Sequence, residues 1–195
     1  MTNKQQIQKI RDNAELAQAA YGYFHLVGKK FKDEEQYPDD KRDKPITLHD
    51  ILDSTYKGYV TSDHTTLINP EELDGDFSPL QSKSFFERYD LLIHQPNTES
   101  GFSATLFGEK RKQKNTESKA IQYTSEYGYI NYTLAIRGTE LLNRGDIGAD
   151  TKLALGNIPK KQHLDMLLFY NQCIGNIPFY VERDSKEYIE SRKVA

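Results

Sequence analysis

A short apolar run over residues 132–136 stops abruptly at the sequence Arg-Gly-Thr-Glu of residues 137–140. The run is brief and rich in strand-forming residue types, which predicts a β-strand, and the glycine predicts a turn directly after it. A turn at that place exposes backbone N–H groups and the hydroxyl of Thr139 at the carboxyl end of the strand. In open α/β sheets, ligands bind at that end. Thr139 is therefore the first candidate for a ligand-facing residue.

Two strand-like runs, residues 102–107 and residues 129–136, are separated by the polar, lysine-rich residues 109–126. This arrangement predicts an antiparallel pair joined by an enlarged, poorly ordered hairpin loop over 109–126. A phosphate or a lipid headgroup could use the basic cluster in this loop. No aromatic or glycine pattern accompanies the charges, however, which favours a solvated loop. The cluster consists of Lys110, Arg111, Lys112 and Lys114.

Three segments have helical periodicity. Apolar residues at three- and four-residue steps predict an amphipathic N-terminal helix that packs on the chain's own core, with a partner- or lipid-binding helix as the alternative. Its apolar positions are Ile7, Ile10, Ala14, Ala17, Tyr21 and Phe24, and Gly28 is its expected stop. Thr47 with Asp50 approximates a capping box at the start of a second helix. The third helix is expected over 160–174, with apolar positions Leu164, Leu167, Leu168, Tyr170 and Ile174. Residues 85–94 fit a helix or a strand.

The composition limits the class of protein. A length of 195 residues suits one domain, and a net charge of −3 gives no general attraction to nucleic acid. No run approaches the roughly 18 apolar residues of a membrane span, and residues 1–12 lack the apolar region of a secretory signal. We therefore expect no transmembrane segment and a cytoplasmic location, with export by a signal-independent route left open. Cys173 is the single cysteine, which fits a reducing compartment, and its apolar surroundings predict a buried structural thiol.

A series of short motifs occurs in order through the second half of the sequence. They are Gln95-Pro96-Asn97-Thr98, residues 100–107, residues 134–140, Asp146-Ile147, Asp150, residues 154–159, Gln162, Asp165 and Phe169-Tyr170. In this order they resemble the bacterial α/β-hydrolase lipases of the class 3, fungal-lipase-like family. The resemblance implies hydrolysis of lipid carboxylic esters through a serine nucleophile, with no cofactor. It also implies that the hydroxyl of Thr139 helps to form the oxyanion hole.

The nucleophile elbow of that family is missing, because no G-x-S-x-G occurs in the sequence. Gly101-Phe102-Ser103 looks similar, but Thr105 stands where the second glycine would be, and the surrounding residues predict a strand interior. The five histidines show no metal-ligand spacing, and we expect no metal site. They are His25, His49, His64, His94 and His163. Asp146 and Asp150 are better explained as loop-closing hydrogen-bond acceptors than as cation ligands.

The expected fold is α/β, a partial α/β-hydrolase domain over 1–195 with a charged tail over 182–195. It comprises N-terminal helices, an antiparallel strand pair and a following amphipathic helix, and it lacks the nucleophile-elbow half. Such a domain leaves a strand edge unpaired, so the expected partners are a lipase half that carries the nucleophile or a second copy of the chain. Alone, the chain is expected to be inactive. A non-catalytic binding protein and a truncated gene product, each derived from a lipase, are the alternatives.

Overall fold

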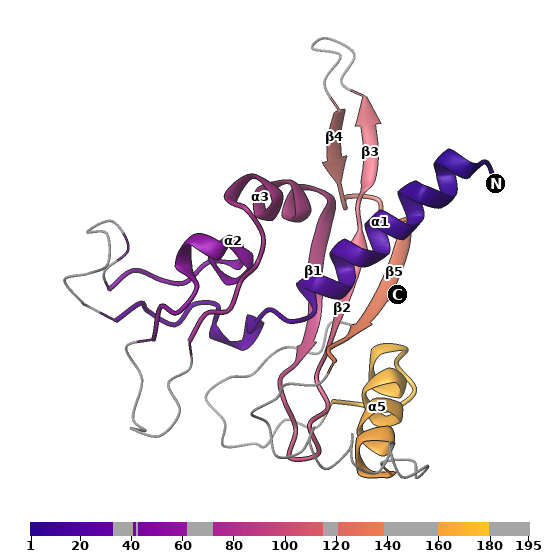
Figure 1. Cartoon of the computed structure of the whole chain (residues 1–195). Coiled ribbons are helices and arrows are strands. Elements are labelled where there is room, and N and C mark those ends of the chain that lie inside the picture. The colour runs from indigo at the N-terminus through magenta and orange to yellow at the C-terminus, as the bar shows by residue number, and fades with distance from the viewer. Residues whose placement is uncertain (33–40, 42, 62–71, 115–120, 139–159, 180–195) are drawn as a thin grey trace. The chain divides into compact units, whose positions relative to one another are not determined.

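The computed structural model describes residues 1–32, 41, 43–61, 72–114, 121–138 and 160–179. The chain forms two compact units, residues 1–96 with 104–137 and residues 97–103 with 138–195, whereas the sequence predicts one domain over 1–195. The architecture is mixed, with α-helices and antiparallel strands (Figure 1). Within the described ranges, no helix is both long enough and apolar enough to cross a membrane.

Helix α1 spans Asn3–Ala19 and begins at a capping box. The side chain of Thr2 accepts a hydrogen bond from the backbone N–H of Gln5, and the side chain of Gln5 accepts one from the backbone N–H of Thr2. Its last turn enters the core of the first unit through Leu16 and Ala19. The expected apolar stripe is only partly buried, because Ile7 and Ile10 at its start are each 69% exposed. The expected end near Gly28 is also wrong. The helix stops at Ala19, and a separate 3-10 turn, Phe24–Leu26, follows.

Two short elements lead from α1 to the sheet. The capping box at Thr47 and Asp50 is confirmed, and it starts helix α2, Leu48–Leu52, which is followed by a 3-10 turn over Ser54–Tyr56. Asp50 is buried, and its carboxylate also receives the ammonium of Lys41 at 2.6 Å. The Asp50 carboxylate thus completes the capping box at the start of α2 and also pairs with a nearby cation.

Residues 79–95 contain both a helix and a strand, which resolves the ambiguity in the sequence. Helix α3, Pro79–Arg88, is capped by Ser78 and passes directly into strand β1, Tyr89–Gln95. Strand β2, Ala104–Glu109, pairs antiparallel with β1 and with strand β5, Asn131–Ile136, in the order β1-β2-β5. The predicted strand pair is confirmed, with each strand beginning two residues later than expected. No described strand pairs with the other edge of β5.

One face of this sheet forms the core of the first unit. Phe107 of β2 is fully buried, and its ring packs edge-on against Phe24 and Phe85 with centroids 6.0 and 5.4 Å apart. Edge-to-face aromatic pairs of this kind add to the free energy gained from burying the rings. Strand β2, the last turn of α1, the 3-10 turn after it and helix α3 therefore share one core.

The segment 109–126 is not the single polar loop that the sequence predicts. Strand β3, Arg111–Lys114, pairs antiparallel with strand β4, Ile121–Thr124, as a separate two-stranded ribbon. The ladder uses backbone groups, and all four β3 side chains are exposed. Strand β3 contains no apolar residue, and the alternation in β4 extends over only four residues, which is why a loop was expected.

The described part of the second unit contains helix α5, Lys160–Cys173. The helix is confirmed, but the side expected to be buried is wrong. Phe169 and Cys173 are buried, whereas the five predicted apolar positions are exposed. Those positions are Leu164, Leu167, Leu168, Tyr170 and Ile174. Thr139, Asp146, Asp150, His64 and the tail over 182–195 lie outside the described residues.

Candidate functional site

The end of the sheet where β1 stops and β2 begins gathers several polar side chains on the core face. The register pairs His94 of β1 with Thr105 of β2, and Thr105 with Ala135 of β5. Side chains alternate along a strand, so Arg137 lies two residues beyond Ala135 in the same direction. This sheet end directly precedes the Gly138-Thr139 sequence of the candidate oxyanion turn.

His94 is the central residue of this group. Its Nδ1 lies 2.9 Å from Oγ1 of Thr105, a hydrogen bond whose donor depends on the tautomer. The ring of Phe24 packs edge-on against it at 5.5 Å. Burial is the main cause that lowers the pKa of His94 to about 3, and electrostatic interactions with His25 and Arg137 contribute in the same direction. His94 is therefore a neutral imidazole at physiological pH.

A stack of aromatic and cationic side chains continues from His94. The imidazole of His25 lies parallel to that of His94, with ring centroids 5.9 Å apart and an interplanar angle of 5°. Tyr23 packs edge-on against His25, and the guanidinium carbon of Arg137 lies 5.0 Å from the centre of the Tyr23 ring. Arg137 is only 5% exposed. A buried guanidinium over an aromatic face is a cation–π contact, and here it holds the residue at the end of β5 against the 3-10 segment.

This grouping was not expected from the sequence. The sequence analysis found no metal-ligand spacing among the histidines, and the structure brings His25 and His94 together. The residues are far apart in the chain, and no spacing rule connects the turn after α1 with the end of β1. A β-bulge between Leu91 and Ile93 changes the register just before His94, and a bulge reverses which side chains face the core.

We expect His94 to make the stability of the protein depend on pH. A histidine whose pKa is about 3 when folded and about 6.5 when unfolded is protonated first in the unfolded chain. Stability is then fully present above pH 6.5 and is lost as the pH falls towards 3. Between pH 7 and pH 5 this one group should remove about 2 kcal/mol. Chemical denaturation of the wild type and of His94→Gln at both pH values tests this, and an equal loss in the two proteins would contradict it.

The second unit contains a smaller polar cluster. A single carboxylate oxygen, Oδ2 of Asp165 in α5, accepts from the hydroxyl of Thr98 at 2.7 Å and from that of Ser100 at 2.6 Å. Gln162, one turn earlier, donates to the backbone oxygen of Gly101 at 3.4 Å. Gly101 has φ 85°, a conformation that favours glycine. These contacts attach the 97–103 turn to α5. Among the described residues, no imidazole is hydrogen-bonded to Ser100, so we interpret the cluster as structural.

Two further residues singled out in the sequence, Ser103 and Cys173, are buried. Ser103 is fully buried, which agrees with its rejection as a nucleophile, although it precedes β2 and is not inside a strand. Cys173 is buried as expected, and burial raises the pKa of its thiol to about 11. Within the described ranges, no group of three or more His, Cys, Asp or Glu side chains could hold a metal ion.

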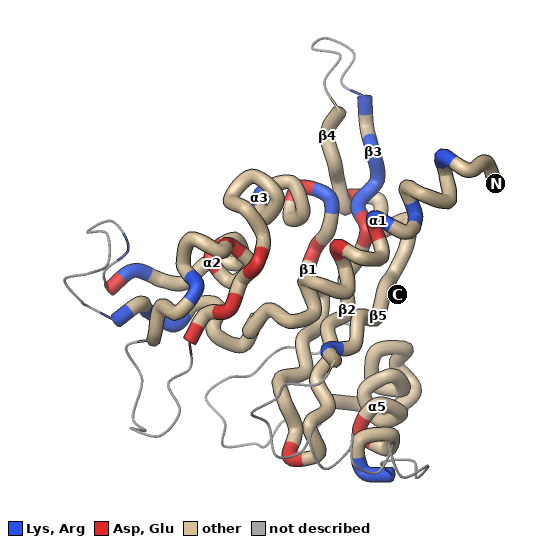
Figure 2. Tube along the Cα trace, in the orientation of Figure 1, with Lys and Arg blue, Asp and Glu red and all other residues tan. Residues whose placement is uncertain are grey.

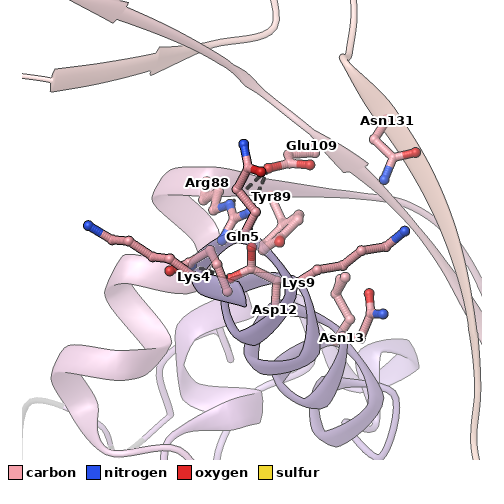
Figure 3. Close-up of a pocket in the computed structure, with 11 residues that line it drawn as sticks. Lys4, Gln5, Lys9, Asp12, Asn13, Arg88, Tyr89, Glu109 and Asn131 are labelled. Atoms are coloured by element: carbon pink, nitrogen blue, oxygen red, sulfur yellow. Dashed lines mark hydrogen bonds and ion pairs between the residues drawn. The ribbon is translucent and has the colours of Figure 1, made fainter. Parts of the chain in front are cut away.

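A polar pocket of about 450 Å³ lies in the first unit, between α1 and the start of β1 (Figure 3). Nη2 of Arg88 lies 2.7 Å from a carboxylate oxygen of Asp12 and 2.7 Å from one of Glu109. The hydrogen bond from Arg88 lowers the pKa of Asp12, and the Asp12 carboxylate in turn raises the pKa of Arg88. Figure 3 shows the long side chains of Lys4 and Lys9 extending away from this triad. Because two carboxylates already balance Arg88, the pocket is better suited to holding α1 in place than to binding an anion.

Comparison of the chain with protein-family models, with curated proteins and with solved structures finds no match.

Proposed function

We propose that these residues form the substrate-side part of a lipase-like serine hydrolase that cleaves lipid carboxylic esters. The observation that carries the proposal is the position of the end of β5. This strand ends at Ile136, directly before the Arg-Gly-Thr sequence whose hydroxyl residue, Thr139, is the oxyanion-hole candidate. A strand that pairs with β2 and ends at this sequence is the arrangement that the resemblance to class 3 lipases implies.

The surroundings of Arg137 support this assignment. An oxyanion donor is effective when it is held in place before the reaction, since it then loses little free energy to reorganisation. Arg137 is buried, and its guanidinium packs on Tyr23, which packs edge-on against His25 of the histidine pair. The residue just before the Gly138-Thr139 sequence is therefore fixed to the core of the first unit.

Two surfaces support the need for further polypeptide. Within the first unit, one edge of β5 has no described partner strand, and Ile136 beside it is 46% exposed. Within the second unit, the exposed side of α5 carries Leu164, Leu167 and Leu168 at helical spacing. An open strand edge and an apolar helix face are both normally covered in a completed α/β domain.

The proposed mechanism is acyl transfer through a serine ester intermediate. A serine supplied outside these 195 residues would attack the ester carbonyl while a histidine, also supplied from outside, takes up the serine proton. When the tetrahedral intermediate collapses, the ester C–O bond breaks and the alcohol leaves with the proton from the histidine. The hydroxyl of Thr139 would donate a hydrogen bond to the oxygen that becomes negatively charged in the tetrahedral intermediate. In this scheme the chain contributes stabilisation of the transition state and no nucleophile.

The purified chain should therefore not react as a serine hydrolase. We expect no labelling by a fluorophosphonate probe and no hydrolysis of p-nitrophenyl butyrate, because no G-x-S-x-G is present and Ser103 is buried. Labelling is measured by intact-mass spectrometry, with heat-denatured chain as the control for adventitious reaction. Stoichiometric labelling of the folded chain at any serine would contradict the proposed division of roles.

A direct test expresses the chain together with a segment that carries the nucleophile. If the DNA downstream of the coding region encodes a G-x-S-x-G segment, expression of both parts together should yield an esterase. Failure of the joined and folded protein to hydrolyse any acyl ester would argue against the proposal and would favour a non-catalytic binding protein.

A further inference from the structure

The β3–β4 ribbon is a projection of the first unit that the proposed site does not use. It extends beyond the three-stranded sheet as a separate two-stranded element (Figure 1). Four register pairs join residues 111–114 to residues 121–124. Since all four β3 side chains are exposed, they are available to a partner without any rearrangement of the core.

The two faces of this ribbon differ in chemistry. The register places Lys112 opposite Tyr123 and Lys114 opposite Ile121. Residues opposite one another in a ladder project to the same side, so one face combines two ammonium groups with an aromatic and an aliphatic side chain. We call these four residues the cationic–apolar face. The other face carries Arg111 and Gln113 with polar partners from β4.

The apolar members of this face are only partly covered by the protein, since Tyr123 is half-buried and Ile121 is exposed. Ile121 is 65% exposed, although it belongs to a strand. The ammonium of Lys112 lies 5.9 Å from the centre of the Tyr123 ring, so a cation and an aromatic side chain lie next to each other on this face of the ribbon. Exposed aliphatic and aromatic side chains beside lysines are typical of proteins that dock at the boundary between headgroups and acyl chains.

The charge of the ribbon is local. Its eight described strand residues include Arg111, Lys112 and Lys114 and no carboxylate, whereas the chain as a whole has a net charge of −3. Figure 2 shows this concentration of basic residues along β3. A cationic element on an acidic chain favours an anionic partner at this place in particular.

We propose that the cationic–apolar face of the β3–β4 ribbon binds an anionic lipid surface. Lys112 and Lys114 contact headgroup phosphates, while Ile121 and Tyr123 enter the interfacial layer. Each lysine near such a surface strengthens binding about fivefold. The phosphates of a nucleic acid would pair with the two lysines equally well, but a nucleic acid has no apolar layer that could accommodate Ile121. The proposal does not depend on ester hydrolysis, since binding is measured on the chain without any nucleophile.

The test is co-sedimentation of the full chain with vesicles. Vesicles of phosphatidylcholine with about one-third phosphatidylserine should bind the chain, and raising the salt concentration should weaken the binding, because exposed charges are screened. Lys112→Gln with Lys114→Gln should weaken binding about 25-fold, since two charges are lost. Ile121→Thr, which keeps a β-branched residue in the strand, should weaken binding several-fold and leave its salt dependence unchanged.

Matched controls separate this face from general electrostatic attraction. Lys44→Gln with Lys83→Gln removes the same charge from exposed positions off the ribbon and should leave binding within about twofold of wild type. Thermal melts of all variants should coincide with wild type, because the substituted side chains are exposed. Equal loss in the two double variants would overturn the proposal. So would equal binding to vesicles of phosphatidylcholine alone, or tight binding to a single-stranded oligonucleotide that Ile121→Thr does not weaken.

Discussion

Thr139→Val should lower kcat by about 10²–10³-fold in an active enzyme that contains these residues, because removal of one oxyanion donor has effects of this size. Valine has nearly the shape of threonine but cannot donate a hydrogen bond. The donor acts mainly on the charge of the tetrahedral intermediate, so KM should change little. The measurement is steady-state hydrolysis of p-nitrophenyl butyrate by the joined protein.

Thr139→Ser is the matched control for that experiment, because serine keeps the hydroxyl and loses only a methyl group. We expect it to retain activity within about tenfold of wild type, since the donor remains. The thermal melts of both variants should match that of the wild type. A joined enzyme whose turnover survives Thr139→Val would show that the oxyanion is stabilised elsewhere, and the functional assignment of the Arg-Gly-Thr sequence would then be wrong.

The largest expected effect on stability comes from Phe107→Ala. Phe107 is fully buried, and its ring contacts the rings of Phe24 and Phe85. Removal of such a ring from a packed core costs about 3–5 kcal/mol, because burial is lost and a cavity remains. Urea denaturation at pH 7 measures the change in the free energy of unfolding.

Ile10→Ala is the control for the core substitution. Ile10 is 69% exposed on the early part of α1, so its truncation should change the free energy of unfolding by less than about 0.5 kcal/mol. A large cost at Ile10, or a small one at Phe107, would mean that the core of the first unit lies elsewhere than on the β2 face.

Local signals predicted local structure well in this chain. The capping box at Thr47 and Asp50 formed as expected, because both partners lie within one helical turn. The β2–β5 pair was also predicted, since each strand carries its own apolar run and β5 ends at a turn signal. The burial of Cys173 was expected from the residues around it.

The failures have a common physical cause, which is that burial depends on contacts between distant segments. Periodicity identified apolar positions on α1 and α5, but it could not show which turns find a partner, and Ile7 and Leu164 remain exposed. The ribbon was missed because backbone pairing alone forms it. The histidine pair was missed because a bulge in β1 determines the direction of His94, and a bulge leaves no clear mark in the sequence.

The β3–β4 ribbon also has a consequence for the order in which the chain folds. Strand β1 needs only residues 96–103 to turn back onto β2, whereas β5 must return across residues 110–130. The cost of closing a loop rises with the logarithm of its length, and pairing of the ribbon first leaves only residue 110 and residues 125–130 between the ribbon and strands β2 and β5. By that relation, the ribbon lowers the entropic barrier for adding β5 by about 1 kcal/mol. Strand β5, whose end leads into the candidate oxyanion turn, would then pair with β2 after the ribbon has formed, and the ribbon would already hold the two strands close together.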